Sequence, residues 1–236
     1  MIDFVKKFLA LTTSRLKLKM KYPDVQIINT SISSEGSLNT YSQRNQDLIV
    51  YNAFFKGKRN GFYCDIGAND PVYMNNTLLF EELGWRGLAF EPLSNQAPLW
   101  KAQRNATFFN YGLSNENTSG TLNIPDDNKF STTLPIWQDN NVRQETVQLK
   151  VLADVFRSLE IKKIDFMSID VEGLEAQVLE GINFDEVSID VILIENNKCS
   201  VNYGDDRLRD ILINSNFRFW GRIPQLDDIF VRQDLL

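Results

Sequence analysis

Apolar segments of strand length alternate with amphipathic segments of helix length along most of this chain, which predicts an α/β fold with a mostly parallel sheet. Two further observations support this fold class. Several apolar segments end in acidic residues or glycine, as strands do at a ligand-binding sheet edge, and the last two can pair as an antiparallel hairpin. Seven strands are therefore predicted, at residues 62–66, 87–91, 107–113, 164–170, 191–195, 217–220 and 228–231.

Helices are predicted in the intervals between these strands, on both faces of the sheet. Ser42 is a suitable N-cap for the first helix, and Gly84 ends the second. Residues 114–141 are less regular, with a weak strand pattern at 121–124, and residues 147–149 resume an extended pattern. The predicted helices cover residues 43–55, 75–83, 94–104, 152–159, 173–179 and 206–214.

The chain of 236 residues has the length of one α/β domain with short additions. We predict a basic helical extension and linker at residues 1–40 and one catalytic domain at 41–236. Residues 1–21 carry a net charge of +5. Because the net charge of the whole chain is −6, the remaining residues carry −11. This segment could dock on a membrane surface or a partner protein. A helix packed on the domain, or a mobile terminus, is the favoured interpretation.

Composition excludes several classes of function. The chain contains no histidine, which rules out zinc sites with histidine ligands and Ser-His-Asp hydrolysis. Any metal would be a hard cation held by oxygen. The net charge of −6 argues against binding to duplex nucleic acid. Two cysteines are too few for a disulfide framework, and no segment has the length of a membrane span. A cytoplasmic protein is expected, which could still be peripheral at a membrane surface.

Residues 62–71, with the sequence Phe-Tyr-Cys-Asp-Ile-Gly-Ala-Asn-Asp-Pro, place a glycine turn directly after a predicted strand. Gly67 and Ala68 let the backbone approach a ligand closely. The third glycine of the dinucleotide motif is absent. A pyrophosphate needs that glycine-rich turn at a helix N-terminus, whereas an amino-acid ligand can pair its ammonium with Asp65. The segment therefore favours S-adenosylmethionine over NAD, with a purely structural turn as the alternative.

Glu91 ends the next predicted strand, 24 positions after Gly67. An acidic residue about 20 positions after the glycine turn is placed to bind a ribose diol, because a carboxylate can accept hydrogen bonds from both hydroxyls. The alternative is a solvated charge at a strand end.

Asp170 and Glu172 follow the fourth predicted strand, which neighbours the first in the expected sheet order. One of these carboxylates could deprotonate or orient a hydroxyl, or both could hold a divalent cation that lowers the pKa of the acceptor. Because an unperturbed carboxylate is a weak base toward an alcohol, positioning of the acceptor is the more important expected role. Alternatively, Glu172 caps the following helix or pairs with a lysine.

Taken together, these segments resemble the FkbM family of methyltransferases. The resemblance covers the chain from about residue 41 to its end and implies a Rossmann-like class I methyltransferase fold. Asn45 differs from the acidic residue that such sequences often have, and residues 115–141 align with no part of the family pattern. The matching features are Ser42-Gln43, Gln46-Asp47, residues 61–71, Asn76-Thr77, residues 84–92, Leu113-Ser114, residues 165–173 and residues 228–231.

The resemblance also implies roles for individual residues. The methionine portion of S-adenosylmethionine would contact Asp65, Gly67, Ala68 and Asn69. The ribose would bind Glu91, and the adenine would lie near Leu113 and Ser114. Asp170 and Glu172 would face the acceptor as the catalytic pair, and no residue is assigned to a metal.

The predicted function is S-adenosylmethionine-dependent O-methylation of a hydroxyl, with a sugar, glycan or secondary metabolite as the acceptor. No nucleic-acid partner is expected, and the oligomeric state is not indicated. One alternative is a catalytically silent module that binds S-adenosylmethionine or a glycan. The other is an NAD-dependent oxidoreductase, against which the incomplete glycine motif and the absence of histidine argue.

Overall fold

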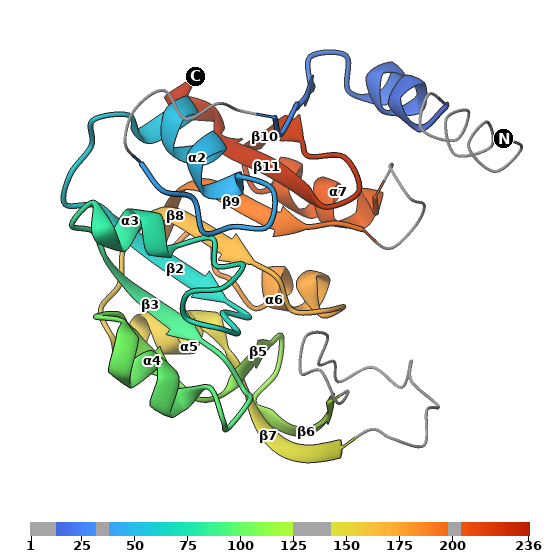
Figure 1. Ribbon diagram of the computed structural model, residues 1–236. Coiled ribbons are helices and arrows are strands. Elements are labelled where there is room, and N and C mark those ends of the chain that lie inside the picture. Colours follow the sequence, from blue (N-terminus) through green and yellow to red (C-terminus); the bar gives the residue numbers. More distant parts are fainter. Residues whose placement is uncertain (1–12, 32–37, 125–142, 198–203) are drawn as a thin grey trace, which may run out of the picture.

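The computed structural model describes residues 13–31, 38–124, 143–197 and 204–236, which form two sheets with helices around the larger one (Figure 1). The larger sheet contains, in spatial order, β1 (Gln26–Ile27), β10 (Phe217–Arg222), β11 (Asp227–Arg232), β9 (Ser188–Glu195), β8 (Lys163–Ile169), β2 (Phe62–Ile66), β3 (Arg86–Phe90) and β4 (Thr107–Phe109). The smaller sheet contains β5 (Gly112–Ser114), β7 (Arg143–Val151) and β6 (Thr118–Ile124).

Five neighbouring strands of the larger sheet, from β9 to β4, run parallel. Strand β11 runs antiparallel to β9 and to β10 and closes the sheet as a hairpin. The predicted Rossmann-like fold, with a mostly parallel sheet and a C-terminal antiparallel hairpin, is therefore confirmed. The sheet has one strand beyond the predicted seven, because the two residues of β1 pair with the edge strand β10.

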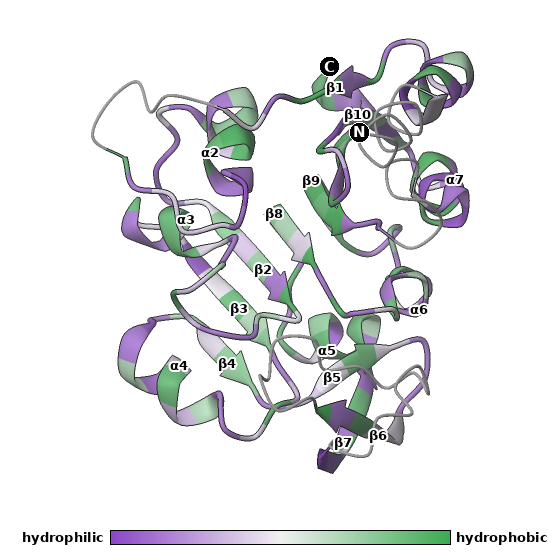
Figure 2. Cartoon of the chain, turned by 45° about the vertical axis from the view of Figure 1, so that its right-hand side comes forward, coloured by the Kyte–Doolittle hydropathy of each residue, from purple (hydrophilic) through white to green (hydrophobic). Residues whose placement is uncertain are grey.

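Helices cover both faces of the larger sheet. Because successive residues of a strand point to opposite faces, Tyr63 and Cys64 of β2 enter different cores. In Figure 2, hydrophobic residues dominate β8 and β9 at the centre of the sheet, where both faces are covered. On the Tyr63 face lie α2 (Gln46–Val50), η1 (Tyr51–Phe55), α3 (Leu78–Glu82) and α4 (Ala97–Gln103). On the Cys64 face lie α5 (Leu152–Ser158), α6 (Glu175–Glu180) and α7 (Asp206–Asn214).

One predicted strand is in fact two separate strands. Residues 107–113 were expected to form one strand, but they form β4 in the larger sheet and β5 in the smaller one. Asn110 breaks the strand because its side-chain amide donates hydrogen bonds to the backbone carbonyls of Glu91 (2.8 Å) and Leu93 (3.1 Å). These bonds turn the chain away from β3 after only three residues of pairing.

The smaller sheet is the largest feature that the sequence indicated only weakly. Strands β6 and β7 pair antiparallel over seven residue pairs, whereas the sequence pattern suggested short extended segments at 121–124 and 147–149. Their polar residues alternate with a few apolar ones that form a separate small core with Leu93. Leu122 and Leu149 of this core also line the cavity described below. The smaller sheet therefore forms one wall of that cavity.

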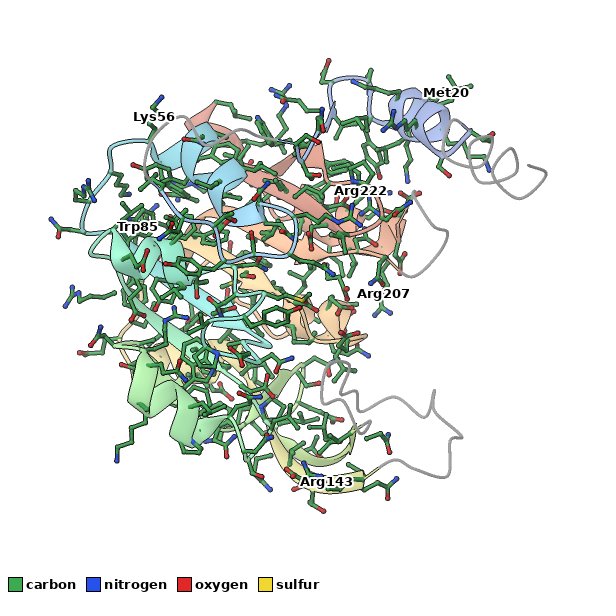
Figure 3. The ribbon with its side chains drawn as sticks, in the orientation of Figure 1. Met20, Lys56, Trp85, Arg143, Arg207 and Arg222 are labelled. Carbon is green, nitrogen blue, oxygen red and sulfur yellow. The ribbon has the colours of Figure 1, made fainter. Side chains whose placement is uncertain are left out.

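The described part of the N-terminal extension packs on the domain. Residues 13–21 are helical, and Leu18 and Val25 are buried in the core on the α7 side. Lys21 forms an ion pair with Asp206 at the start of α7, 2.8 Å apart. Met20 faces outward from this helix and is 77% exposed (Figure 3). The apolar residues of 1–11 lie outside the described part. Within the described residues, no helix is long and apolar enough to cross a membrane.

Candidate active site

A cavity of about 750 Å³ lies at the carboxyl ends of the central parallel strands. The residues that follow β2, β3, β8 and β9 line it, together with apolar side chains of the smaller sheet. Ligands of open α/β sheets bind at this edge, and the volume lies in the range of small-molecule and cofactor sites. Most of the site residues predicted from the sequence lie at this edge of the sheet.

The glycine turn after β2 packs directly against the chain that leaves β8. Asp170 donates its backbone N–H to the carbonyl oxygen of Ile66 (2.9 Å). Gly67 has a φ of +76°, and a Cβ atom there would lie 1.7 Å from the backbone oxygen of Asp170. Only glycine fits this position, because a side chain would separate the two strand ends. The two sequence segments around Gly67 and Asp170 therefore form one structural unit.

Glu91 holds the turn after β2 against the loop after β3. Its two carboxylate oxygens accept hydrogen bonds from the backbone N–H groups of Asn69 (2.9 Å) and Leu93 (2.8 Å). The side chain is buried and lines the cavity. Burial raises the pKa of Glu91 to about 7, although the two backbone hydrogen bonds oppose this shift. Each oxygen keeps a second lone pair that can accept a hydrogen bond from a ligand hydroxyl.

Asp65 is buried at the floor of the cavity and holds the loop after β2. One of its oxygens accepts hydrogen bonds from Thr77 Oγ1 (2.6 Å) and Asn75 Nδ2 (3.3 Å). Burial raises the pKa of Asp65. Arg104 supports the same loop from outside the cavity, since Nη1 donates to the backbone oxygen of Pro71 (2.7 Å) and to Asn75 Oδ1 (3.0 Å). The loop that carries Ala68 and Asn69 is thus held from both sides.

Two residues of the α4 segment contribute to the site and were missed in the sequence. Trp100 Nε1 donates to the backbone oxygen of Asn69 (2.7 Å), and Gln96 Nε2 donates to Asn69 Oδ1 (3.3 Å). Gln96 lines the cavity, and its buried Oε1 has no hydrogen-bond partner within the described chain. A polar residue before a helix is common, so the sequence contained no pattern that distinguishes Gln96 from a solvent-exposed glutamine.

Leu113 and Ser114 occupy different places in the structure. Leu113 is buried and lines the cavity beside Leu122 and Leu149. Ser114 is also buried, but it is not among the lining residues, and its hydroxyl is 3.3 Å from Asn115 Oδ1. Of the two residues expected near the adenine, only Leu113 therefore lines the cavity, as part of an apolar wall.

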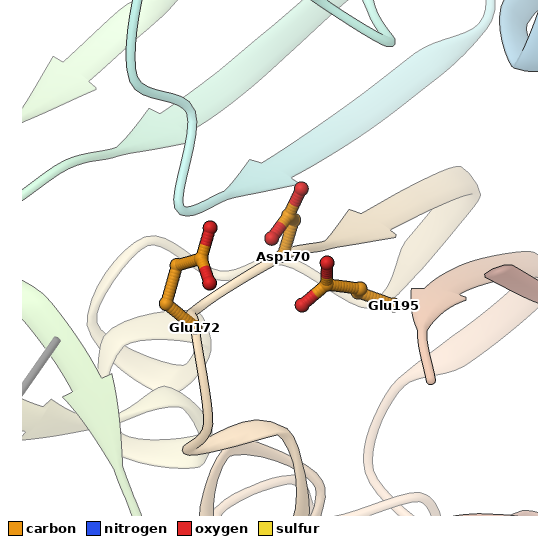
Figure 4. A group of neighbouring side chains, drawn as sticks. All are labelled: Asp170, Glu172 and Glu195. Carbon is orange, nitrogen blue, oxygen red and sulfur yellow. The ribbon is translucent and has the colours of Figure 1, made fainter. Parts of the chain in front are cut away.

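At the other end, Asp170, Glu172 and Glu195 bring three carboxylates together (Figure 4). One oxygen atom from each lies within 4.8 Å of the others. Glu195 ends β9 and was not assigned to the site from the sequence, because its proximity to Asp170 depends on the pairing of β8 with β9. The hydrogen bonds at the start of α6 come from Glu175, whose Oε1 accepts from the backbone N–H of Gly173 (2.9 Å). The N-cap residue of α6 is Leu174, and no side chain forms a capping hydrogen bond there, so Glu172 does not cap this helix.

At this end of the cavity, burial and repulsion between like charges raise the pKa values of the carboxyl groups. Burial, reinforced by the neighbouring Glu172, raises the pKa of Asp170 well above its ordinary value. Burial and the charge of Asp170 raise the pKa of Glu195 to about 11. Asp227 is also buried on this wall, with Gln46 Nε2 donating to it (3.0 Å), and burial raises its pKa to about 6.

The cavity as a whole is acidic. Among the described residues that line it, none is lysine or arginine. Those of its carboxyl groups that are ionised give the cleft a negative potential, which favours ligands with positive charge. The lining carboxylates are those of Asp65, Asp70, Glu91, Asp170, Glu172, Glu195 and Asp227.

Comparisons with solved structures return methyltransferases. One is a methyltransferase FkbM from Methylobacillus flagellatus KT, with 12% sequence identity, a TM-score of 0.46, and coverage of 98% of this chain and 60% of that chain. Another is a precorrin-6y C5,15-methyltransferase from Geobacter metallireducens GS-15, with 12% identity, a TM-score of 0.43, and coverage of 89% and 98%. This chain thus spans about 60% of the length of the FkbM structure. A search of curated protein sequences finds no significant match.

A comparison with models of protein families is more specific. The model of the methyltransferase FkbM domain matches residues 65–219. The match covers more than half of the chain and runs from the glycine turn after β2 to the strand β10 of the closing hairpin. It includes the strand ends that bring Gly67, Glu91 and Asp170 to one cavity. The chain therefore belongs to the FkbM methyltransferase family.

Proposed function

We propose that this methyltransferase uses S-adenosylmethionine to methylate a hydroxyl group, with a sugar, glycan or secondary metabolite as the acceptor. The observation that carries the proposal is the arrangement of one cavity. It brings together the glycine turn at Gly67, the carboxylate of Glu91 and the carboxylates around Asp170, which lie beside that turn. The volume of about 750 Å³ leaves room for a cofactor and part of an acceptor.

The residues present fit S-adenosylmethionine. When bound, this cofactor supplies an electrophilic methyl group on a positively charged sulfonium. Glu91 offers a free lone pair on each oxygen for the ribose hydroxyls, and the unpartnered Oε1 of Gln96 offers a further acceptor close by. Leu113 and the leucines beside it offer an apolar wall for the adenine ring. Asp65 offers a carboxylate for the ammonium of the methionine portion.

The charge of the cavity favours this cofactor over NAD. S-adenosylmethionine has a net positive charge, whereas the pyrophosphate of NAD is negative. A pyrophosphate would enter a cavity whose described lining residues include seven acidic side chains, part of them protonated because burial raises their pKa, and no lysine or arginine. Since like charges in a cleft of low dielectric repel strongly, the structure supports the choice that the incomplete glycine motif suggested.

Asp170 and Glu172 are the residues that we assign to the acceptor. A hydroxyl must be held in line with the methyl group, and it loses its proton as the new bond to oxygen forms. Asp170 follows β8 directly, and its backbone hydrogen bond to Ile66 holds its main chain beside the glycine turn. Glu172 lies next to it in the same group of carboxylates.

Calorimetry with S-adenosylhomocysteine and NAD, in parallel titrations of the same protein, tests the cofactor. We expect binding of one S-adenosylhomocysteine per chain and no measurable heat from NAD. Binding of NAD without binding of S-adenosylhomocysteine would overturn the proposal.

Conservative substitutions test the acceptor side. We expect Asp170→Asn and Glu172→Gln to reduce transfer of labelled methyl groups to a hydroxyl acceptor by about 100-fold or more, since positioned acid–base groups contribute about 10²–10⁴-fold. Binding of S-adenosylhomocysteine should persist in both variants. Glu186→Gln, which alters an exposed carboxylate paired with Arg157 far from the cavity, is the matched control. Unchanged transfer in the first two variants would remove this assignment.

A further inference from the structure

The helix at residues 13–21 packs on the domain through one face only. Leu18 is 1% exposed and lies in the core on the α7 side. Successive residues of a helix are rotated by about 100°, so Leu16 and Met20, two positions before and after Leu18, lie on the opposite face. They are 63% and 77% exposed, the largest exposed fractions among the large apolar side chains of the described residues. Figure 3 shows Met20 on the outer side of this helix.

Basic side chains flank this apolar face on both sides. Lys17 and Lys19 directly precede and follow Leu18, so they point to opposite flanks of the helix, each about 100° from the packed face. Arg15 is also exposed, on the same flank as Lys19. Lys19 Nζ donates to the backbone oxygen of Pro23 (3.1 Å), which leaves its charge without an acidic partner. Within the described part of the chain, no acidic side chain pairs with any of these three basic residues.

The charge of this helix is opposite to that of the rest of the chain. Residues 13–21 contain four basic and no acidic side chains, and the fourth, Lys21, is the one that pairs with Asp206. The whole chain carries −6 and residues 1–21 carry +5, so residues 22–236 carry −11. An anionic surface therefore attracts the helix and repels the body of the protein. This asymmetry turns the outer face of the helix toward such a surface.

We propose that the outer face of residues 13–21 docks on the surface of an anionic lipid membrane. Leu16 and Met20 enter the boundary between headgroups and acyl chains, as the apolar face of an interfacial helix does. The long stems of Lys17 and Lys19 let their charged ends reach the anionic headgroups on either side. The helix lies at the edge of the molecule beyond β10, so the body of the protein does not stand in the way (Figure 1).

The size of this face favours a membrane over a protein partner. A stable protein interface uses about 20–30 residues on each side, whereas the exposed apolar part of this helix consists of Leu16 and Met20. A helix at a membrane surface needs only a short apolar stripe with basic flanks, because lipids adapt to its shape and supply the negative charge. The docking is independent of the proposed function.

Sedimentation of the full-length protein with lipid vesicles tests the proposal. The vesicles contain phosphatidylcholine alone or an equal mixture of phosphatidylcholine and phosphatidylserine. Each basic residue near an anionic surface contributes about fivefold to the affinity, so three of them predict about 100-fold tighter binding to the mixed vesicles. Binding to the mixed vesicles should weaken as the salt concentration rises, because salt screens exposed charges.

Two double variants of the helix separate the contributions. Lys17→Gln with Lys19→Gln should weaken binding to the mixed vesicles by about 25-fold, from about fivefold for each charge. Leu16→Ala with Met20→Ala should weaken it by about tenfold or more, since each methylene that leaves water contributes about fourfold. Alanine keeps the helix, because it has the highest helix propensity.

The matched controls make the same changes at exposed positions elsewhere. Lys56→Gln with Lys101→Gln changes the net charge of the chain by the same amount. Leu159→Ala with Leu235→Ala shortens two exposed apolar side chains outside the helix. Each control should change the affinity by less than about threefold, because these positions lie away from the docked face.

Three results would overturn the proposal. Absence of binding to the mixed vesicles would exclude a lipid surface and leave a protein as the occupant of this face. Equal weakening by the two lysine pairs would indicate attraction through net charge alone. Wild-type affinity in both helix variants would place the membrane contact elsewhere in the chain. Circular dichroism identifies a variant that fails to fold, and the other helix variant then carries the test. Both variants should bind S-adenosylhomocysteine as the wild type does, so a failure of the proposed function is detected separately.

Discussion

The raised pKa of Glu91 predicts that affinity for S-adenosylhomocysteine increases as the pH rises through about 7. Glu91 lines the cavity, and both of its oxygens already accept one backbone hydrogen bond each. Burial raises its pKa from 4.5 to about 7, and the charge of Asp65 acts in the same direction. Only the ionised carboxylate has acceptor capacity on both oxygens for the two ribose hydroxyls. The protonated form must therefore lose its proton when the ligand binds.

The size of the effect follows from the ionised fraction. With a pKa of about 7, this fraction is about 0.1 at pH 6 and about 0.9 at pH 8. The dissociation constant should therefore be about tenfold larger at pH 6 than at pH 8, a difference of about 1.4 kcal/mol. Calorimetric titration at several pH values and constant ionic strength measures it directly.

The variant Glu91→Gln provides the control. Its amide does not titrate, so the part of the pH dependence that comes from Glu91 should disappear. Loss of hydrogen bonds to a charged group, each worth about 1.5–3 kcal/mol, should weaken binding by about 10–100-fold at pH 8. A wild-type affinity that is constant between pH 6 and pH 8, or a variant that keeps the wild-type slope, would refute the reasoning.

The same shift has a consequence for stability, with a defined sign. The pKa of Glu91 is higher in the folded state than the unfolded value of about 4.5. The stability that Glu91 contributes is therefore fully present below pH 4.5 and is lost as the pH rises through 7. Relative to Glu91→Gln, the free energy of unfolding of the ligand-free wild type should fall by about 3 kcal/mol across this window. Urea unfolding at pH 4.5 and pH 8 measures the change, and an increase with pH would contradict it.

Three further variants test the framework of the site. Gly67→Ala should lower the free energy of unfolding by more than about 3 kcal/mol in urea, because its Cβ would displace a strand end. Gly84→Ala, at a φ of +89° with open space around it, should cost only about 1–2 kcal/mol, and equal losses would contradict the packing argument. Gln96→Leu should weaken S-adenosylhomocysteine binding about tenfold. Gln103→Leu, at an exposed position, should leave the affinity unchanged. If both variants bind as the wild type does, Gln96 does not belong to the site. Arg104→Met should cost about 3–5 kcal/mol, because it leaves a buried carboxylate on α3 without its ion pair. A loss below about 1 kcal/mol in urea unfolding would show that the loop after β2 does not depend on this residue.

The sequence alone determined the parallel core of the fold, and it placed Gly67 and Glu91 at the sheet edge where the cavity lies. Fully buried strands are continuous apolar runs with clear ends, so β2, β8 and β9 were recognisable without any knowledge of their partners. Gly67 and Glu91 were recognisable because their roles depend on a turn and a strand end, which are local features. The sequence indicated the smaller sheet only weakly. The polar residues that alternate along β6 and β7 identify these segments as strands only once the two are paired.

The tertiary structure decided the rest. The pairing of β8 with β9 brings Glu195 to Asp170 from 25 residues away, and local sequence does not encode that distance. The packing of α4 turns Gln96 into the cavity with a buried, unpartnered oxygen. Asn110 ended a strand that its apolar neighbours predicted to continue, because its amide found two carbonyl groups in a loop that follows another strand. In each case the deciding contact joins residues far apart in the chain, and its energy exists only in the folded state.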